Sequence, residues 1–383
     1  MSQSVCFVTC NTFTTNAFLA GPIRTLAEDD WAVTVVCNTV DGQVDQGVHQ
    51  VARVLSMDLA RQIAPWQDLR VLWQLWRLFR RERFDVVHSI TPKAGLLAML
   101  AAWAARIPAR HHTFTGQVWA TRRGPMRWLL RSLDQIFAAA ATEVLADSPS
   151  QRDFMAGEHV APLQRIRVLG DGSICGVDTQ RFRPDPVQRA LVRQELGVAA
   201  DAVILLYLGR LHPEKGVQEL GVAFGDLATV HPNVHLVLVG PDEGALPAVR
   251  TACQQAASRL HVVGMSRTPE RYMAAADVFC LPSFREGFGL SLLEAAAVGV
   301  PCVATRIYGI TDAVEDGRTG LLVPPHDAGA LREAIERLVL APSLRSTLGQ
   351  RARERAAARF SRERMLGAWR DFYRGTSGTG ARR

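Results

Sequence analysis

The segment SFREGFGLSLLE, residues 283–294, decides how the second half of the chain folds. It follows the apolar run 277–281, which has the length and composition of a buried strand, and it leads into a helical pattern that ends near Gly299. Gly287 and Gly289 bracket a phenylalanine between strand and helix. Glycine lets backbone approach a ligand closely, and the first turn of a helix presents unpaired N–H groups to an anion. The segment therefore predicts an anion-binding turn.

Two carboxylates accompany this turn. Glu286 lies in the turn itself and Glu294 lies eight positions later in the helix. Carboxylates accept hydrogen bonds from hydroxyl groups, whereas the glycine-rich helix start is suited to phosphate. Phosphate donors beside hydroxyl acceptors are what a sugar nucleotide requires.

A second turn of this kind, GRLHPEKG at residues 209–216, follows the strand expected at 203–208. It places Arg210 and Lys215 past the carboxyl end of a strand, where α/β sheets bind ligands. Arginine offers a planar fork to a diphosphate and lysine offers a point charge. Because two such turns fall in one domain, we favour a phosphate-binding function over two solvated surface cations.

Strands and helices alternate along the whole chain, which predicts two doubly wound α/β domains. A chain of 383 residues is also too long for one ordinary core. From the breaks in this rhythm we expect a first Rossmann-like domain at 1–172, a Gly/Pro/Asp-rich linker at 173–186, a second Rossmann-like domain at 187–360, a C-terminal helix at 361–374 that returns to the first domain, and a disordered tail at 375–383.

The composition narrows the class of protein. Lys and Arg number 44 against 37 Asp and Glu, a net charge of +7 that suits an anionic ligand or membrane surface but is too small for a nucleic-acid-binding protein. The seven cysteines form no CxxC pair, which favours buried free thiols over disulfides or zinc. We see no secretory signal, and the longest uncharged stretch, 94–105, is too short to cross a bilayer. We therefore expect a cytoplasmic protein, peripheral on the inner face of the cytoplasmic membrane.

The two turns, spaced as they are, resemble those of glycosyltransferase family 4, retaining nucleotide-sugar enzymes of the GT-B fold. In that fold two Rossmann-like domains face each other across a cleft. The spacing of Glu286 and Glu294 is similar to the family's E-x7-E pattern. The first half of the chain looks like the capsule and O-antigen enzymes that act on polyprenyl-diphosphate sugars. That narrower likeness rests on TPKAGL at 91–96, HTFTG at 112–116 and ADS at 146–148.

The resemblance implies a role for each matched residue. Arg210 and Lys215 would hold the donor diphosphate and stabilise the leaving group, and Glu294 would take the ribose hydroxyls. Glu286 would contact hydroxyls of the donor sugar, and His112 would end a strand of the first domain and sit over that sugar. The remaining donor contacts would come from Gly209, Gly287, Phe288, Gly289 and Leu290.

Two further side chains, Asn16 and Lys93, are candidates, and His112 is favoured over its neighbour His111. Many family members carry a glycine pair in the loop after the first strand, but residues 11–16 contain none, and we choose Asn16 as the substrate contact there. His111 and His112 are neighbours on a strand and must face opposite sides, so only one can face the cleft. Lys93 is open between an anion contact and a solvated lysine at a helix end.

Two basic segments are rich in tryptophan, residues 66–83 and 119–131. Trp and Arg on an amphipathic surface suit docking on anionic lipid headgroups. For residues 66–83 the apolar stripe is narrow and regular, so we expect its tryptophans in the core. For residues 119–131 core and membrane are equally supported, with Arg122 and Arg123 as candidate contacts to lipid or to a lipid-diphosphate acceptor.

The predicted function follows from the resemblance. No Asp-x-Asp motif is present, so we expect transfer without a metal and without a cofactor. The enzyme would transfer a hexose or N-acetylhexosamine from a nucleotide sugar, most simply UDP-linked, to a polyprenyl-diphosphate glycan in capsule, O-antigen or exopolysaccharide synthesis. Two alternatives stay open: a sugar-nucleotide 2-epimerase of the same fold, and a non-catalytic nucleotide-sugar-binding partner in polysaccharide assembly.

Overall fold

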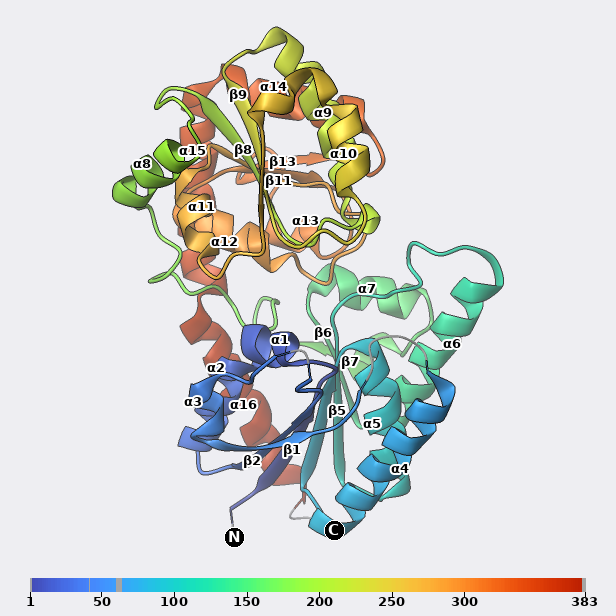
Figure 1. Cartoon of the computed structure of the whole chain (residues 1–383). Coiled ribbons are helices and arrows are strands. Elements are labelled where there is room, and N and C mark those ends of the chain that lie inside the picture. Colours follow the sequence, from blue (N-terminus) through green and yellow to red (C-terminus); the bar gives the residue numbers. More distant parts are fainter. Residues whose placement is uncertain (1, 41, 60–63, 381–383) are drawn as a thin grey trace. The chain divides into compact units, whose positions relative to one another are not determined.

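The computed structural model describes residues 2–40, 42–59 and 64–380 (Figure 1). The chain forms two compact units. The first comprises Met1–Cys175 and Glu363–Arg383, and the second comprises Gly176–Arg362. Each unit is built on one parallel sheet with helices on both faces, as expected for two doubly wound domains.

The sheet of the first unit has seven strands in the order β3-β2-β1-β4-β5-β6-β7. All six neighbouring pairs are parallel. Strand β4 is fully buried, and its two polar side chains, His88 and Ser89, are hydrogen-bonded inside the core. The strands are β1 (Ser4–Val8), β2 (Ala32–Cys37), β3 (Ala52–Ser56), β4 (Val86–Ile90), β5 (Ala109–Phe114), β6 (Glu143–Ala146) and β7 (Ile166–Val168).

The helices of the first unit are α1 (Thr12–Thr14), the π-helical turn η1 (Thr15–Leu19), α2 (Ala20–Glu28), α3 (Gln46–His49), α4 (Pro65–Glu82), α5 (Pro92–Ala104), α6 (Gly124–Ala140), α7 (Pro149–Gly157), the 3-10 turn η2 (Leu163–Arg165) and α16 (Arg362–Gly380). Helix α5 packs between α4 and α6 on one side of the sheet (Figure 1). Ser148 caps α7 through a bond from the Gln151 amide, as its sequence predicts.

The orientation of α4 contradicts the expectation for residues 66–83. The side chains of Trp66, Trp73 and Trp76 are 86%, 54% and 38% exposed, and they do not lie in the core. The buried face of α4 is formed instead by Val71, Leu75, Leu78 and Phe79. The helix carries apolar residues on two faces, and packing selects the face without tryptophan.

Helix α16 completes the core of the first unit. The Trp369 indole donates to the Ile174 carbonyl at 2.9 Å, and the Tyr373 hydroxyl lies 2.8 Å from His88 Nδ1. The tail expected to be disordered, 375–383, is helical as far as Gly380, and residues 381–383 lie outside the described part. No proline interrupts the helix after these buried anchors, and the Thr376 hydroxyl bonds back to the Phe372 carbonyl at 3.1 Å.

The sheet of the second unit has six parallel strands in the order β10-β9-β8-β11-β12-β13. Its strands are β8 (Val203–Leu208), β9 (Val234–Val239), β10 (Leu260–Gly264), β11 (Val278–Leu281), β12 (Cys302–Thr305) and β13 (Gly320–Val323). Its helices and 3-10 turns are α8 (Pro186–Glu195), η3 (Pro213–Lys215), α9 (Val217–Val230), α10 (Leu246–Ala252), η4 (Gln254–Arg259), α11 (Pro269–Ala275), α12 (Leu290–Val298), α13 (Ile310–Ala313), α14 (Ala328–Leu340) and α15 (Pro342–Phe360).

The second unit begins and ends at one place. Val177 pairs with Ser361 in a parallel bridge. The Val177 amide donates to the Phe360 carbonyl at 2.8 Å, and the Arg362 amide donates to the Val177 carbonyl at 2.9 Å. Gly176 stands where a Cβ would lie 2.8 Å from the Phe360 carbonyl oxygen, which explains a glycine at this point.

Two expectations from composition can be compared with the structure. All seven cysteines are buried thiols outside any disulfide, as predicted. Of the helices in the described ranges, none combines the length and the apolar character that crossing a bilayer would require.

Candidate active site

The two predicted turns of the second unit lie side by side, because β8 and β11 are neighbours in the sheet. The Phe284 amide donates to the Glu214 carbonyl at 2.9 Å. Two ion pairs then cross between the turns: Lys215 Nζ lies 2.6 Å from Glu286 Oε1, and Arg285 lies 2.9 Å from Glu214 Oε2. Sequence analysis placed these turns in one domain, and the structure brings their charged side chains into direct contact.

Close backbone contact holds the turns together. Gly216 has φ +64°, and a Cβ at this position would lie 2.0 Å from the Pro282 carbonyl oxygen. A side chain there would therefore push the turns apart. Ser283 Oγ donates to Glu286 Oε1 at 2.7 Å, and the Thr305 hydroxyl in turn donates to the Ser283 carbonyl. The Glu286 carboxylate is thus oriented by a lysine and a hydroxyl together.

Helix α12 begins at this site without a side-chain cap. Its N-cap residue Gly289 has φ +82° and, as a glycine, supplies no side-chain cap to the first amides of the helix. Those amides are suited to an anion, as the sequence predicts. The Phe288 ring is buried and packs on Phe360 at a centroid distance of 5.3 Å, so this residue offers backbone, not side chain, to a ligand. Leu290 is the first residue of α12.

Arg210 extends from the turn after β8 and forms an ion pair with the Glu243 carboxylate. The backbone around it is fixed by the Tyr207 hydroxyl, which donates to the Arg210 carbonyl at 2.7 Å. Glu243 lies in the loop after β9, which approaches so closely that a Cβ on Gly240 would lie 1.9 Å from the Gly209 carbonyl oxygen. Sequence analysis missed Glu243. The glycine-bounded acidic loop at 240–244, after the strand next to β8, is the signal that points to it.

Glu294 stands apart from these pairs. Within the described ranges its carboxylate has no hydrogen bond and no ion pair, although it is partly buried in α12. Desolvation raises the pKa of Glu294 to about 7, against a lowering effect of Arg181. Hydroxyl donors at this position would stabilise the ionised form, which fits the predicted role as a partner of ribose hydroxyls. In the part of the chain that the structure describes, no three His, Cys, Asp or Glu side chains gather as a candidate metal site.

In the first unit, His112 lies two residues before the end of β5, not at its carboxyl end as expected. The imidazole is fully buried, with Nδ1 2.8 Å from Ser89 Oγ and with no partner for Nε2 among the described residues. It packs so closely on α5 that a Cβ on Gly95 would lie 2.4 Å from Cε1. Burial lowers the pKa of His112 to about 3, so the ring is neutral. Its contact with a donor sugar stays a prediction.

His111 faces the opposite side of the sheet, as expected for neighbours on a strand. Its ring centroid lies 4.9 Å from that of Phe372 in α16, whereas the His112 ring lies 4.8 Å from Phe137 in α6. Burial lowers the pKa of His111 to about 3. The two imidazoles therefore pack against different helices on opposite faces of the sheet.

The two other candidates of the first unit already have protein partners. The Asn16 amide donates to the Gln43 carbonyl at 2.9 Å and accepts from the Asp45 amide at 2.8 Å. Lys93 Nζ lies 2.6 Å from Asp68 Oδ1, which ties the start of α5 to the first turn of α4. Substrate roles for Asn16 and Lys93 stay predictions.

The segment 119–131 divides between core and surface. Arg122 and Arg123 are exposed, as a membrane or acceptor contact requires. Arg127 instead pairs with Glu158 at 2.6 Å and lies over the buried Trp119 ring at 5.2 Å. The core interpretation holds for Trp119, whereas a lipid or acceptor contact of Arg122 and Arg123 stays a prediction.

Comparisons with known proteins agree for both units. The model of the family "Glycosyl transferases group 1" matches residues 188–355, and the model of the "Glycosyl transferase 4-like domain" matches residues 15–172.

Individual relatives cover most of the chain. A capsular polysaccharide biosynthesis glycosyltransferase, CapM of Staphylococcus aureus, is 31% identical over 346 residues, which is 90% of each chain. The Escherichia coli UDP-Gal:alpha-D-GlcNAc-diphosphoundecaprenol alpha-1,3-galactosyltransferase is 25% identical over 318 residues, 82% of this chain and 81% of that one. Among solved structures, sucrose-phosphate synthase of Thermosynechococcus elongatus superposes with a TM-score of 0.81 at 22% identity, covering 98% of this chain and 100% of that one, and it has the same two-domain GT-B fold.

Proposed function

The chain belongs to the group 1 glycosyltransferases of family 4, a family of retaining hexosyltransferases, and we propose that it uses a UDP-linked donor and a lipid-linked glycan acceptor. The sugar transferred would be a hexose or an N-acetylhexosamine. The product would be an extended polyprenyl-diphosphate glycan, used for a capsule, an O-antigen or an exopolysaccharide.

The observation that carries the donor assignment is the state of the two cations in the second unit. Lys215 and Arg210 follow one strand, and each is held by a carboxylate, Glu286 and Glu243 respectively. A diphosphate offers the same chemistry as those carboxylates, with more charge and more acceptor oxygens. On binding, the diphosphate would replace the two carboxylates as the ion-pair partner of Lys215 and Arg210. The amides at the start of α12 would donate further hydrogen bonds to it.

The chemistry then follows from charge. The bond between the anomeric carbon and the diphosphate oxygen breaks, and the acceptor hydroxyl oxygen bonds the same face of that carbon. The hydroxyl proton passes to the departing diphosphate oxygen, so no protein base is needed. Positive groups already fixed beside the leaving oxygens lower the barrier. In this scheme Lys215 and Arg210 supply the neutralising charge, and no metal is required.

Two carboxylates select the rest of the donor. Glu294, whose pKa is raised to about 7, would accept hydrogen bonds from the ribose hydroxyls. Glu286 would exchange its bond with Lys215 for hydroxyls of the donor sugar while Ser283 keeps it oriented. Both roles use acceptor groups that are positioned before the donor arrives.

The acceptor assignment rests on the first unit and on one relative. The Escherichia coli relative acts, by its name, on a GlcNAc-diphosphoundecaprenol with UDP-Gal, and the alignment covers 82% of this chain. We assign acceptor binding to residues 1–172 and place the enzyme as a peripheral protein on an anionic membrane. Arg122 and Arg123 are exposed, so an anionic group could reach both side chains.

The test is incubation of the full chain with a panel of UDP- and GDP-sugars and a polyprenyl-diphosphate-linked sugar, read by mass. We expect one UDP-sugar to add a single sugar mass to the lipid acceptor. Conversion of the donor in the absence of acceptor would replace the proposal with an epimerase. Nucleotide-sugar binding without any turnover would replace it with a non-catalytic binding protein.

A further inference from the structure

The outer face of α4 exposes tryptophan and arginine together. Its exposed residues recur every three or four positions, which places them on one side of the helix. They are Trp66, Leu69, Arg70, Trp73, Trp76, Arg77 and Arg80. Trp66 is 86% exposed and Leu69 is 57% exposed, far more than a core-packed helix would leave open. We refer to these seven residues as the α4 face.

The charge of the α4 face is purely positive. The two acidic residues of α4 lie elsewhere and are paired, Asp68 with Lys93 at 2.6 Å and Glu82 with Arg81 at 2.7 Å. Among the described residues, Arg70 and Arg80 have no ion pair, and the Arg77 guanidinium lies over the Trp73 ring at 5.4 Å. The three arginines of the face are therefore available to an anionic surface.

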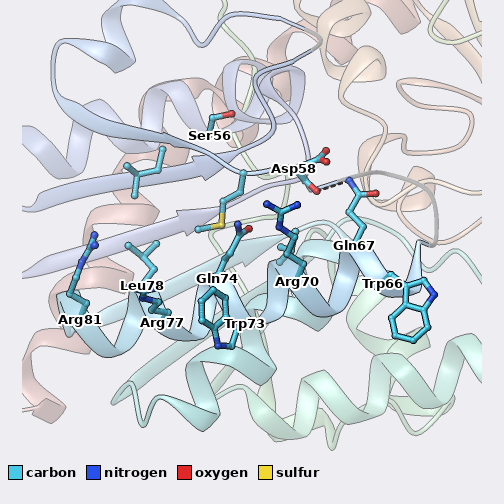
Figure 2. A pocket seen from close by; sticks show the side chains of 13 residues that line it. Ser56, Asp58, Trp66, Gln67, Arg70, Trp73, Gln74, Arg77, Leu78 and Arg81 are labelled. Carbon is cyan, nitrogen blue, oxygen red and sulfur yellow. Dashed lines mark hydrogen bonds between the residues drawn. The ribbon is translucent and has the colours of Figure 1, made fainter.

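The two flanks of the helix differ in chemistry. On one flank a hollow of about 870 Å³ separates α4 from the end of β3, and Arg70, Arg77 and Arg81 line it with Gln67 and Gln74 (Figure 2). On the other flank an apolar groove of about 410 Å³ runs between α4 and α5. That groove is lined by Leu69, Leu72, Trp73, Trp76, Leu100 and Trp103, with two alanines. A recess of mixed arginine, amide and apolar lining and a largely apolar groove thus border the same exposed ridge.

We propose that the α4 face docks the enzyme on an anionic lipid bilayer, with the helix lying along the membrane surface. The indoles would enter the region between headgroups and acyl chains, where tryptophan is preferred. The arginines would contact lipid phosphates, and the hollow beside Arg70 would admit a headgroup. This deepens the proposed function, on which it rests for its purpose, by naming the surface that brings the enzyme to a lipid-linked acceptor.

Charge and shape favour a bilayer over other partners. Helix α4 has 18 residues, a length of about 27 Å, so its face presents a long ridge to a flat surface. A second copy of the same face would bring like charges together. The Asp58 carboxylate at the edge of the hollow accepts from the Asn38 amide at 3.3 Å, and among the described residues it forms no ion pair with an arginine of the face.

The test measures binding of the full chain to vesicles without donor or acceptor. Flotation and tryptophan fluorescence are recorded with phosphatidylcholine vesicles, with and without phosphatidylglycerol. We expect binding and a blue shift only with the anionic lipid. The triple variant Arg70→Gln, Arg77→Gln, Arg80→Gln should lower partitioning on the order of a hundredfold, because each surface arginine contributes roughly a fivefold factor. The triple variant Trp66→Gln, Trp73→Gln, Trp76→Gln should lose the blue shift.

A matched control removes the same charge elsewhere. Arg267, Arg351 and Arg353 are exposed in the second unit, and their triple change to Gln should leave vesicle binding within about twofold, since lipid attraction is local. Equal vesicle binding by the α4 arginine variant and the wild type would overturn the proposal. A dimer that forms without vesicles and is abolished by the α4 variants would also overturn it. Because the readout needs no sugar transfer, failure of the proposed function would not change it.

Discussion

Cations are arranged in opposite ways in the donor-binding turns of the second unit and on the α4 face of the first. Lys215 and Arg210 each contact a carboxylate. Among the described residues Arg70 and Arg80 contact none, and their neighbours are exposed tryptophans. A paired cation binds only a ligand that can replace its carboxylate in the same geometry. An unpaired cation attracts any anionic surface. The first arrangement favours selectivity and the second favours adhesion.

The largest effect should come from removing a paired cation. We expect Lys215→Ala to lower kcat/KM about a thousandfold. The variant lacks the positive charge beside the leaving diphosphate, and the Glu286 carboxylate then faces the diphosphate without its lysine partner. The measurement is transfer to a lipid acceptor, with circular dichroism to verify the fold.

Arg318 supplies the control for that variant. It forms a surface pair with Glu315 at 3.1 Å, and Arg318→Ala should change turnover by less than about twofold. Wild-type turnover by Lys215→Ala would remove the lysine from the site and with it one side of the comparison.

The next effect tests how tightly the turns are joined. Gly216→Ala would place a Cβ 2.0 Å from the Pro282 carbonyl oxygen, so we expect a loss of about 3 kcal/mol in the free energy of unfolding of the second unit, with weaker UDP binding. Gly197 has a similar φ of +65° but nothing within 4 Å of its Cβ position, and Gly197→Ala should cost only about 1 kcal/mol. Equal losses in denaturant titrations would mean that the close approach of the turns is unimportant.

A third, smaller effect concerns pH. The pKa of Glu294 is raised to about 7, so the carboxylate is ionised above that pH and protonated below it. Only the ionised form accepts from both ribose hydroxyls, and we expect the dissociation constant of a UDP-sugar to rise up to about tenfold per unit as the pH falls below 7. Glu294→Gln should bind weakly with a flat profile.

Asp147 in the first unit supplies the control for that profile. Burial raises the pKa of Asp147 to about 8, so it titrates in a neighbouring range. Asp147→Asn should leave the pH dependence of donor binding unchanged. If this variant flattened the profile and Glu294→Gln did not, the ribose assignment would be wrong.

The smallest effect should be that of an unpaired arginine on stability. Arg70→Gln removes no ion pair to any residue that the structure describes, and we expect a change within about 0.5 kcal/mol in the free energy of unfolding. Arg193 is buried and lies 2.5 Å from Asp277 Oδ2, so Arg193→Gln should cost about 3 kcal/mol. A large loss for Arg70→Gln would show that the α4 face stabilises the fold and is not free for a partner.

The same comparison explains where sequence reasoning succeeded. Parallel strands buried on both faces must be apolar throughout, so β8 and β11 are visible as runs, and the glycines that follow them mark the turns. The spacing of Glu286 and Glu294 is a local feature of the sequence, so it can be recognised without knowing how the side chains pack. These features predicted two α/β domains, and they predicted the residues that the second unit brings to one edge.

Other features depend on tertiary packing and could not be predicted from local sequence patterns. Helix α4 has one apolar set at Trp66, Leu69, Trp73 and Trp76 and another at Val71, Leu75, Leu78 and Phe79, and periodicity alone does not tell which set is buried. Glu243 was missed because it lies 33 residues from Arg210 and meets it only through the neighbouring strand β9. His112 was expected at a strand end, but the strand continues to Phe114 and buries the ring.

The bridge between Val177 and Ser361 has a consequence for how such enzymes diversify. Residues 176–362 form an uninterrupted cassette whose entry and exit are hydrogen-bonded neighbours. Exchanging the cassette for that of a relative requires only two adjoining junctions and leaves the seven-stranded sheet with its returning helix whole. Recombination at these two junctions, which are far apart in sequence and adjacent in space, can therefore reassort the two halves of the catalyst as independent modules.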